Sequence, residues 1–148
     1  MGYKRQYLNF GSATLAVALT LYGCTNKTGH GEHADAALKD RTKDGRMSPL
    51  LRNLGNYRRQ VSAKTEDGAR FFNQGLILVY GFNHPEALRS FEESARVEPR
   101  WGMAYWGQAL ALAPNINDSA IGPDREKQGY EAIQKALGNK ASLSPVEV

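Results

Sequence analysis

The stretch GARFFNQGLILVYGFNHPEALRSFEESARVEP, residues 68–99, decides the fold. Apolar residues such as Phe72, Leu76 and Tyr80 recur at four-residue steps, which is typical of one face of a helix. The stretch predicts one helix over residues 67–80 and a second over residues 85–97. The polar turn between them contains a proline suited to a helix start, and the Glu-Pro pair after them ends the second helix.

The order of small and large residues in this hairpin resembles the tetratricopeptide repeat, a unit of 34 residues. Six positions match its pattern of aromatic, small and large residues: Phe71, Gly75, Leu78, Ala87, Phe91 and Ser94. Small side chains let two antiparallel helices approach, and aromatic rings fill the space beside the crossing. Gly75 and Ala87 are therefore expected at the contact between the two helices.

A second unit begins at the same offset along the chain. Its first helix repeats the aromatic, small and large residues with Tyr105, Ala109 and Leu112, and Pro114 ends it. Residues 132–137 read as the partner helix, which Gly138 stops, after an insertion of about eight residues that should form a long turn.

The last residues have the form of a further helix start. Ser144 takes the cap position, proline follows, and Glu147 is third, as in a capping box. Two hairpins also fall short of the three or so repeats that usually close a solenoid core. The chain is therefore expected to be a fragment, or a truncated product, of a longer repeat protein.

Residues 1–23 have the order of a secretory signal, with basic, apolar and small residues in turn. Lys4 and Arg5 precede an apolar run over residues 10–21, and Gly23 lies directly before Cys24. The run falls short of the roughly 20 apolar residues that span a bilayer, which makes an uncleaved membrane anchor the weaker alternative.

The same segment resembles a bacterial lipoprotein signal, in which a leucine three residues before the cysteine marks the cleavage site. The resemblance implies that Cys24 is lipidated and anchors the protein in a membrane. Thr25 in place of aspartate implies the outer membrane, with the protein facing the periplasm. Cys24 is the only cysteine, so neither an internal disulfide nor a cysteine-rich zinc site is expected.

Residues 24–47 are predicted to be a disordered tether, because they contain too few apolar side chains to order themselves. His30 and His33 lie in this tether and are read as solvated linker residues. Residues 48–66 are assigned to an N-terminal capping segment, and residues 67–148 to about two hairpins. The predicted fold is all-α, the start of an α-solenoid behind a signal peptide and a tether.

Residues 49–147 resemble a family of secreted bacterial tetratricopeptide-repeat lipoproteins that are several hundred residues long and largely of unknown function. The matching segments are LGNY at 54–57, FNQGL at 72–76, YGFNH at 80–84, AYWG at 104–107 and PNIN at 114–117. The chain corresponds to the N-terminal part of such a protein. The resemblance implies a helical-repeat fold and supplies no catalytic mechanism.

The main binding candidates are apolar side chains on the first helix of each hairpin. In repeats of this type those faces line a concave groove, which suits a protein or peptide ligand with aromatic anchors. The candidate groove residues are Phe72, Leu76, Tyr80, Trp106 and Leu110. The alternative is that they contact neighbouring repeats or residues 50–57.

The two turns offer a second candidate site. Asn83 and His84 of the first turn could act with Asn115 and Asn117 of the insertion in a metal-binding, ligand-binding or enzymatic protein that further repeats complete. The alternative is a turn histidine that hydrogen-bonds backbone amides. No second ordered histidine, cysteine or paired carboxylate completes a metal site, so no metal or other cofactor is expected.

Composition and motifs argue against several functions. The net charge is +4, and without Lys4 and Arg5 the chain carries 17 basic against 15 acidic residues, with no basic stripe for nucleic acid. No nucleophile elbow or phosphate loop is present, and Glu92 and Glu93 read as charges on an outer helix face, so the chain is not expected to be an enzyme. The leading expectation is a lipid-anchored scaffold; a non-functional truncated product is a further alternative.

Overall fold

The computed structural model describes residues 41–148, and its long elements are four helices. They are α2 (Glu66–Tyr80), α3 (His84–Val97), α4 (Gly102–Leu112) and α5 (Pro123–Gly138), followed by the short 3-10 helix η1 (Lys140–Ser142). No β-strand is present among the described residues. The all-α prediction is confirmed for this part of the chain.

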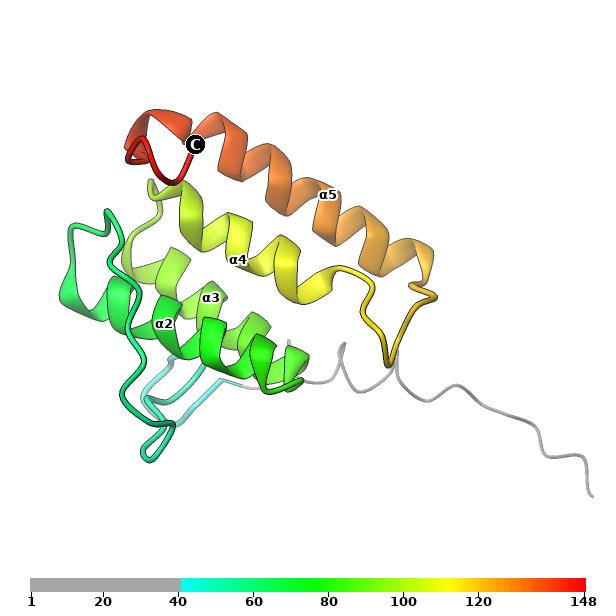
Figure 1. Ribbon diagram of the computed structural model, residues 1–148, viewed down its shortest axis with the longest axis horizontal. Coiled ribbons are helices and arrows are strands. Elements are labelled where there is room, and N and C mark those ends of the chain that lie inside the picture. Colours follow the sequence, from blue (N-terminus) through cyan, green and yellow to red (C-terminus); the bar gives the residue numbers. More distant parts are fainter. Residues whose placement is uncertain (1–40) are drawn as a thin grey trace, which may run out of the picture.

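The helices stack in chain order (Figure 1). α2 packs against α3, α4 lies across both of them, and α5 packs on α4. The first two helices begin one residue earlier than predicted, at Glu66 and His84. The Thr65 hydroxyl caps α2 by accepting from the Gly68 N–H at 3.1 Å, and the Asn83 side chain caps α3 by accepting from the Glu86 N–H at 3.4 Å.

The core is organised around the Phe91 ring of α3, which is fully buried. A Cβ atom added to Gly75 of α2 would lie 2.6 Å from this ring, and one added to Gly107 of α4 would overlap the ring from the other helix. Both helices can therefore reach α3 only because these residues lack side chains. The close approach at Gly75 was predicted from the sequence, and the one at Gly107 was not.

The second hairpin departs from the prediction at α5. This helix begins at Pro123, well before residue 132, so the insertion after α4 ends at Gly122. Proline in the first turn, with Asp124 and Glu126 close behind it, favours a helix start at this position. The predicted helix at 132–137 is therefore the second half of a longer one.

Residues 144–147, where the start of a further helix was predicted, form a single turn. The Ser144 N–H donates to the Glu147 carboxylate at 2.8 Å, as in a capping box, but the Glu147 N–H donates to the Ser144 carbonyl at 2.9 Å. The same carboxylate accepts from the Ser62 N–H at 2.9 Å. Glu147 thus ties this turn to the segment before α2.

Residues 47–64 lie against the first hairpin without regular secondary structure (Figure 1); residues 48–66 were assigned above to an N-terminal capping segment. Gln74 of α2 holds them: its Nε2 donates to the Ser48 hydroxyl at 3.1 Å and the Pro49 carbonyl at 2.9 Å, and its Oε1 accepts from the Leu51 N–H at 2.8 Å. Asn73 accepts from the Arg59 N–H at 2.6 Å. A buried amide with all these partners fixes the segment firmly.

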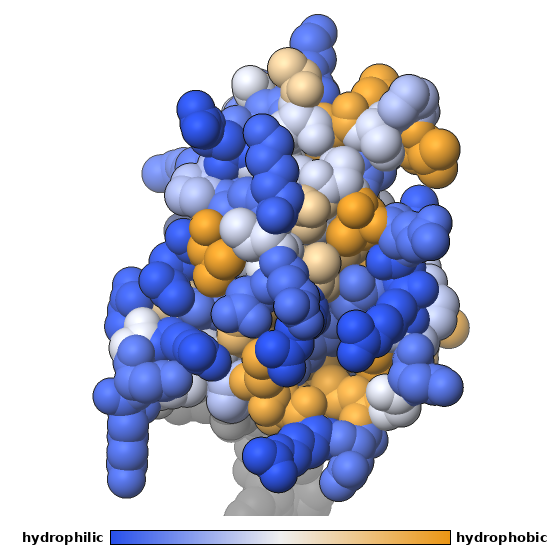
Figure 2. Space-filling view, turned by 90° about the vertical axis from the view of Figure 1, so that its left-hand side faces the viewer, coloured by the Kyte–Doolittle hydropathy of each residue, from blue (hydrophilic) through white to orange (hydrophobic). Residues whose placement is uncertain are grey.

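The packed part also begins before residue 48. The Met47 N–H donates to the buried Glu93 carboxylate at 2.9 Å, so residue 47, assigned above to the tether, is attached to α3. The end of the molecule at which the residues before α2 and the C-terminal turn lie is covered mostly by hydrophilic side chains (Figure 2).

Candidate functional site

An open groove with a volume of about 420 Å³ runs between α4 and α5. Its lining is mainly apolar and includes Trp106, Ala109, Leu110, Ile121, Tyr130 and Ile133. Tyr130 is 65% exposed and Trp106 is 39% exposed, although both belong to well-packed helices. Adjacent exposed apolar side chains of this kind mark interaction surfaces. We call this surface the α4/α5 groove.

The structure corrects the predicted binding stripe at two positions. Phe72 is 0% exposed and Leu76 is 4% exposed, so neither is available to a ligand. Tyr80 is exposed at the end of α2 and does not line the α4/α5 groove. Only Trp106 and Leu110 of the five candidates lie together in that groove.

The Phe72 ring supports Trp106 of α4 and Trp101, the residue just before α4. Its centroid lies 5.0 Å from that of Trp101 and 6.5 Å from that of Trp106. Trp106 therefore packs against the core with one part of its ring system and lines the groove with another. Because this packing restricts its side chain, little conformational entropy remains to be lost when a ligand binds.

Tyr130 and Ile133 of α5 were missed by the sequence analysis. They lie three residues apart, and the small Ala132 and Ala136 are the residues that α5 buries. A helix with buried alanines and exposed large apolar residues offers a second apolar face for a partner. The alternation of alanines with large apolar residues along α5 is the sequence pattern from which Tyr130 and Ile133 could have been predicted.

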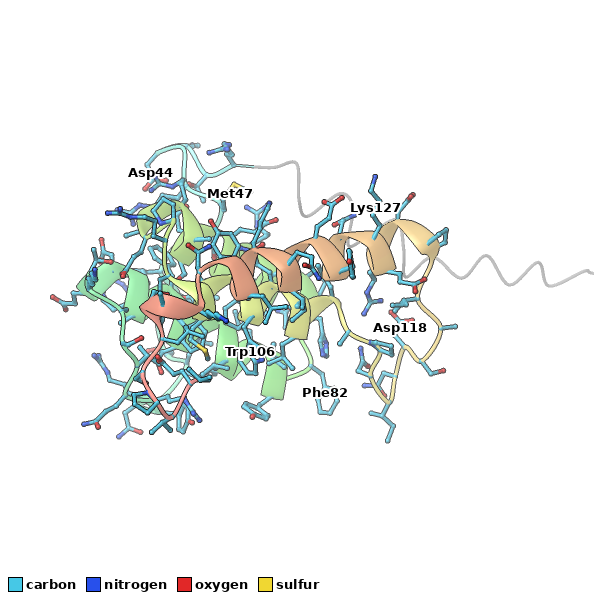
Figure 3. All side chains as sticks on the ribbon, turned by 90° about the horizontal axis from the view of Figure 1, so that it is seen from above. Asp44, Met47, Phe82, Trp106, Asp118 and Lys127 are labelled. Carbon is cyan, nitrogen blue, oxygen red and sulfur yellow. The ribbon has the colours of Figure 1, made fainter. Side chains whose placement is uncertain are left out.

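A second cavity, of about 260 Å³, lies between the α2–α3 turn and the insertion after α4, and we call it the turn cavity. Its lining includes Phe82, His84, Leu88, Leu112, Asn115 and Asn117. Figure 3 shows Phe82 and Asp118, from these two turns, toward the same end of the helices. The structure thus brings three of the four predicted turn residues together, while Asn83 caps α3.

The insertion is held in place by Arg125. Its Nε donates to the Leu112 carbonyl at 2.9 Å and its Nη2 to the Ala113 carbonyl at 3.0 Å, and its third nitrogen pairs with Asp118. Asp118 in turn exchanges two backbone hydrogen bonds with Asn115, at 3.0 and 3.1 Å. One arginine therefore caps the end of α4 and fixes one wall of the turn cavity.

Glu92 and Glu93 of α3 are not charges on an outer face, which corrects the sequence reading. Glu93 is 0% exposed, and this burial favours its neutral form. Hydrogen bonds from the Arg96 guanidinium, at 2.6 and 2.9 Å, and from the Met47 N–H favour the ionised form and keep the pKa of Glu93 below its ordinary value. Burial instead raises the pKa of Glu92 to about 7, against the opposing charges of Arg89 and Arg41. Of these two neighbouring carboxyls, Glu93 is therefore stabilised in its ionised form and Glu92 in its neutral form.

Residues 41–148 contain no cluster of three or more histidine, cysteine, aspartate or glutamate side chains suited to a metal ion. None of the helices in this range is long and apolar enough to cross a membrane. The lipidation candidate Cys24, the signal at 1–23, and the tether histidines His30 and His33 lie outside the described residues.

Comparisons of the chain with models of protein families, with curated proteins and with solved structures found no match.

Proposed function

We propose that the chain is a tetratricopeptide-type scaffold whose α4/α5 groove binds an apolar helix of a partner protein. The observation that carries the proposal is that this groove is open, while the corresponding surface of the first hairpin is filled by a helix of the chain itself.

Phe72 and Leu76 on α2 are buried where α4 lies across α2 and α3. Trp106 and Leu110 follow them by 34 residues, one repeat length, and lie on α4. No helix among the described residues covers Trp106 and Leu110 in the same way. A helix in the α4/α5 groove would repeat the packing that α4 makes on the first hairpin.

α4 also indicates what kind of helix fits. It approaches α3 closely through Gly107, and its small Ala104 belongs to the same buried core as Phe72 and Phe91. A ligand helix for the α4/α5 groove should therefore present small residues between larger apolar ones.

The charges at the rim of the groove favour a neutral or basic ligand. Arg125 is bonded to Asp118 and to two carbonyl groups, so its charge is already compensated. Glu126 also lines the groove and forms no ion pair within residues 41–148. A lysine or arginine beside Glu126 would complement this acid and would fix the direction of the bound helix.

Site-specific crosslinking tests the groove. A photoreactive phenylalanine in place of Tyr130 of the full chain should crosslink to a partner protein in the cells that make it. Adding Ile133→Lys should reduce that crosslink at least tenfold, because a lysine at the contact would have to be desolvated. Mass spectrometry should place the crosslink in a helix with small and apolar residues on one face.

The matched control carries the same photoreactive residue at Tyr57, which is also exposed but lies in the segment that covers α2. Equal crosslinking from position 57, or a Tyr130 crosslink that survives Ile133→Lys in a folded chain, would contradict the proposal. A crosslink only to a second copy of the chain would replace it with self-association.

We further propose that Cys24 is lipidated and holds the scaffold at the outer membrane on its periplasmic side. Leu21, Gly23 and Cys24 support this, as does the apolar run before them. Labelled palmitate should be incorporated by bacteria that express the full chain, and Cys24→Ser should abolish the label and move the protein to the soluble fraction. Label that persists in the Cys24→Ser chain would exclude this anchor.

A further inference from the structure

Phe82, at the edge of the turn cavity, has an unfavourable backbone conformation. Its φ is 59°, in the left-handed region that large residues rarely enter. The Asn83 N–H donates to the Leu78 carbonyl at 2.8 Å and the Phe82 N–H to the Val79 carbonyl at 3.0 Å, a helix ending in which glycine is usual at position 82. The neighbouring Gly81, with φ −83°, has no need of that freedom.

The core gains little from this phenylalanine, because Phe82 is 58% exposed. Its side chain lines the turn cavity, and its ring centroid lies 6.2 Å from that of His84. We propose that the turn cavity binds a small neutral molecule that has an aromatic or aliphatic body and an end group able both to donate and to accept hydrogen bonds.

The body of such a molecule would contact the apolar part of the cavity. Leu88 of α3 and Leu112 of α4 line it and belong to the buried core, so their positions are fixed. Phe82 adds an exposed ring that can cover the ligand. A dry apolar cavity of about 150 Å³ is enough for benzene, so the turn cavity, at about 260 Å³, has room for a ring and a short polar substituent.

The end group would meet polar side chains from both turns. Within residues 41–148, no hydrogen bond to the His84 ring or from the Asn117 amide group is formed. An amide both donates and accepts, and a neutral imidazole does the same through its two nitrogens. These two residues can therefore recognise an amide or a hydroxyl group.

The charges in the cavity indicate that the ligand is neutral. Asp118 and Arg125 pair with each other, and Arg125 also binds two carbonyl groups of the chain. A charged ligand would have to lose water without gaining a free counter-charge. Since the same contacts fix the insertion, the cavity needs no rearrangement to accept a ligand.

The test is a titration of the ¹⁵N-labelled full chain with benzamide, followed by NMR. Benzamide has the proposed body and end group, and its dissociation constant should be on the order of 1 mM for a ligand of this size. Saturable shifts should be centred on residues 82–84 and 115–118. Toluene, which lacks the polar group, and benzoate, which is charged, should bind at least fivefold more weakly.

Phe82→Gly separates binding from stability. It should raise the Tm, because glycine relieves the left-handed backbone, and it should weaken benzamide binding at least fivefold. Asn117→Ala should weaken binding by a similar factor. Ile116→Ala is the matched control, since Ile116 is exposed in the same loop and does not line the cavity, and its binding should match that of the unchanged chain.

The proposal would be overturned by unchanged benzamide affinity in Phe82→Gly, or by shifts that stay linear in concentration and centre on no site. Shifts centred on Trp106 and Tyr130 would place benzamide in the α4/α5 groove and would also exclude it. The helix-binding proposal for that groove is tested by crosslinking, so either proposal can fail alone.

Discussion

Gly107→Ala should lower the free energy of unfolding by about 2 kcal/mol, although alanine normally stabilises a helix interior relative to glycine by about 0.5–1 kcal/mol. The added Cβ would overlap the Phe91 ring. That ring has little room to turn away, because Gly75 of α2 also approaches its Cδ1–Cε1 edge, 2.6 Å from where a Cβ would lie. α4 must therefore move away from α3, and contacts along the whole helix pair are weakened.

Urea denaturation of the full chain, followed by far-UV circular dichroism, measures this effect. The matched control is Gly129→Ala in the middle of α5, where an added Cβ would meet only the Leu112 Cβ at 3.7 Å, an ordinary contact. This control should gain up to about 1 kcal/mol from helix propensity. A Gly107→Ala chain as stable as the control would mean that α4 does not pack on Phe91 in this way.

The same substitution would affect the proposed binding surface. Trp106 is the residue before Gly107, and its ring packs against Phe72. If α4 moves outward, this support is lost and the α4/α5 groove changes shape. Gly107→Ala should therefore also weaken the crosslink from Tyr130, even at temperatures where the chain stays folded.

The first hairpin could be predicted from sequence because its signals are local. The turn with Asn83 and the proline after His84 mark a helix start, and Glu98 before Pro99 marks a helix end. These effects depend on backbone geometry within a few residues. The predicted start of α3, at residue 85, is within one residue of the observed start at His84.

The burial of individual side chains depended on neighbours far away in sequence. Phe72 was expected on a groove face because its position within α2 allows it, and only the packing of α4 decides that it is covered. Likewise, Glu93 lies beside other polar residues in the sequence but is buried by Met47 and its neighbours. Helix periodicity identifies a face, whereas the partner of that face is a tertiary property.

The candidate turn site could be predicted only in part, because its walls come from elements that lie far apart in the sequence. His84, Asn115 and Asn117 were singled out as turn residues, and the stacking of α4 on α3 brings their turns together. Phe82 was missed because an aromatic residue after glycine gives no sign of a left-handed backbone. Arg125 was missed because its three contacts are all with the end of α4 and the insertion.

Glu92→Gln should make the chain more stable at pH 8 by up to about 3 kcal/mol and should have little effect at pH 4.5. Burial raises the pKa of Glu92 from 4.5 to about 7, and its Oε2 atom has no hydrogen-bond partner among the described residues. Each pKa unit corresponds to about 1.36 kcal/mol. A glutamine resembles the neutral carboxyl in shape and cannot ionise.

The direction of this pH dependence follows from the number of protons that the folded and the unfolded chain bind. Below pH 4.5 the carboxyl is protonated in both the folded and the unfolded chain. Between pH 4.5 and 7 the unfolded chain releases the proton while the folded chain keeps it, so the stability falls as the pH rises. Above pH 7 the folded chain contains an ionised carboxylate that is partly buried. The stability has then fallen by the full amount that the pKa shift of Glu92 causes.

Urea denaturation of both chains between pH 4.5 and 8 measures this difference, because Glu93, Glu147 and all other groups contribute equally and cancel. The charges of Arg89 and Arg41 act on Glu92, and Glu131 and Lys135 of α5 line the same small cavity as Glu92. Glu131→Gln is the matched control: its side chain is exposed, and within residues 41–148 its one ion pair is with Lys127, at 3.9 Å, so its effect should stay below about 0.5 kcal/mol. A constant difference between the Glu92→Gln chain and the unchanged chain across this pH range would show that folding does not raise the pKa of Glu92, and that the cavity between α3 and α5 is wetter than its geometry indicates.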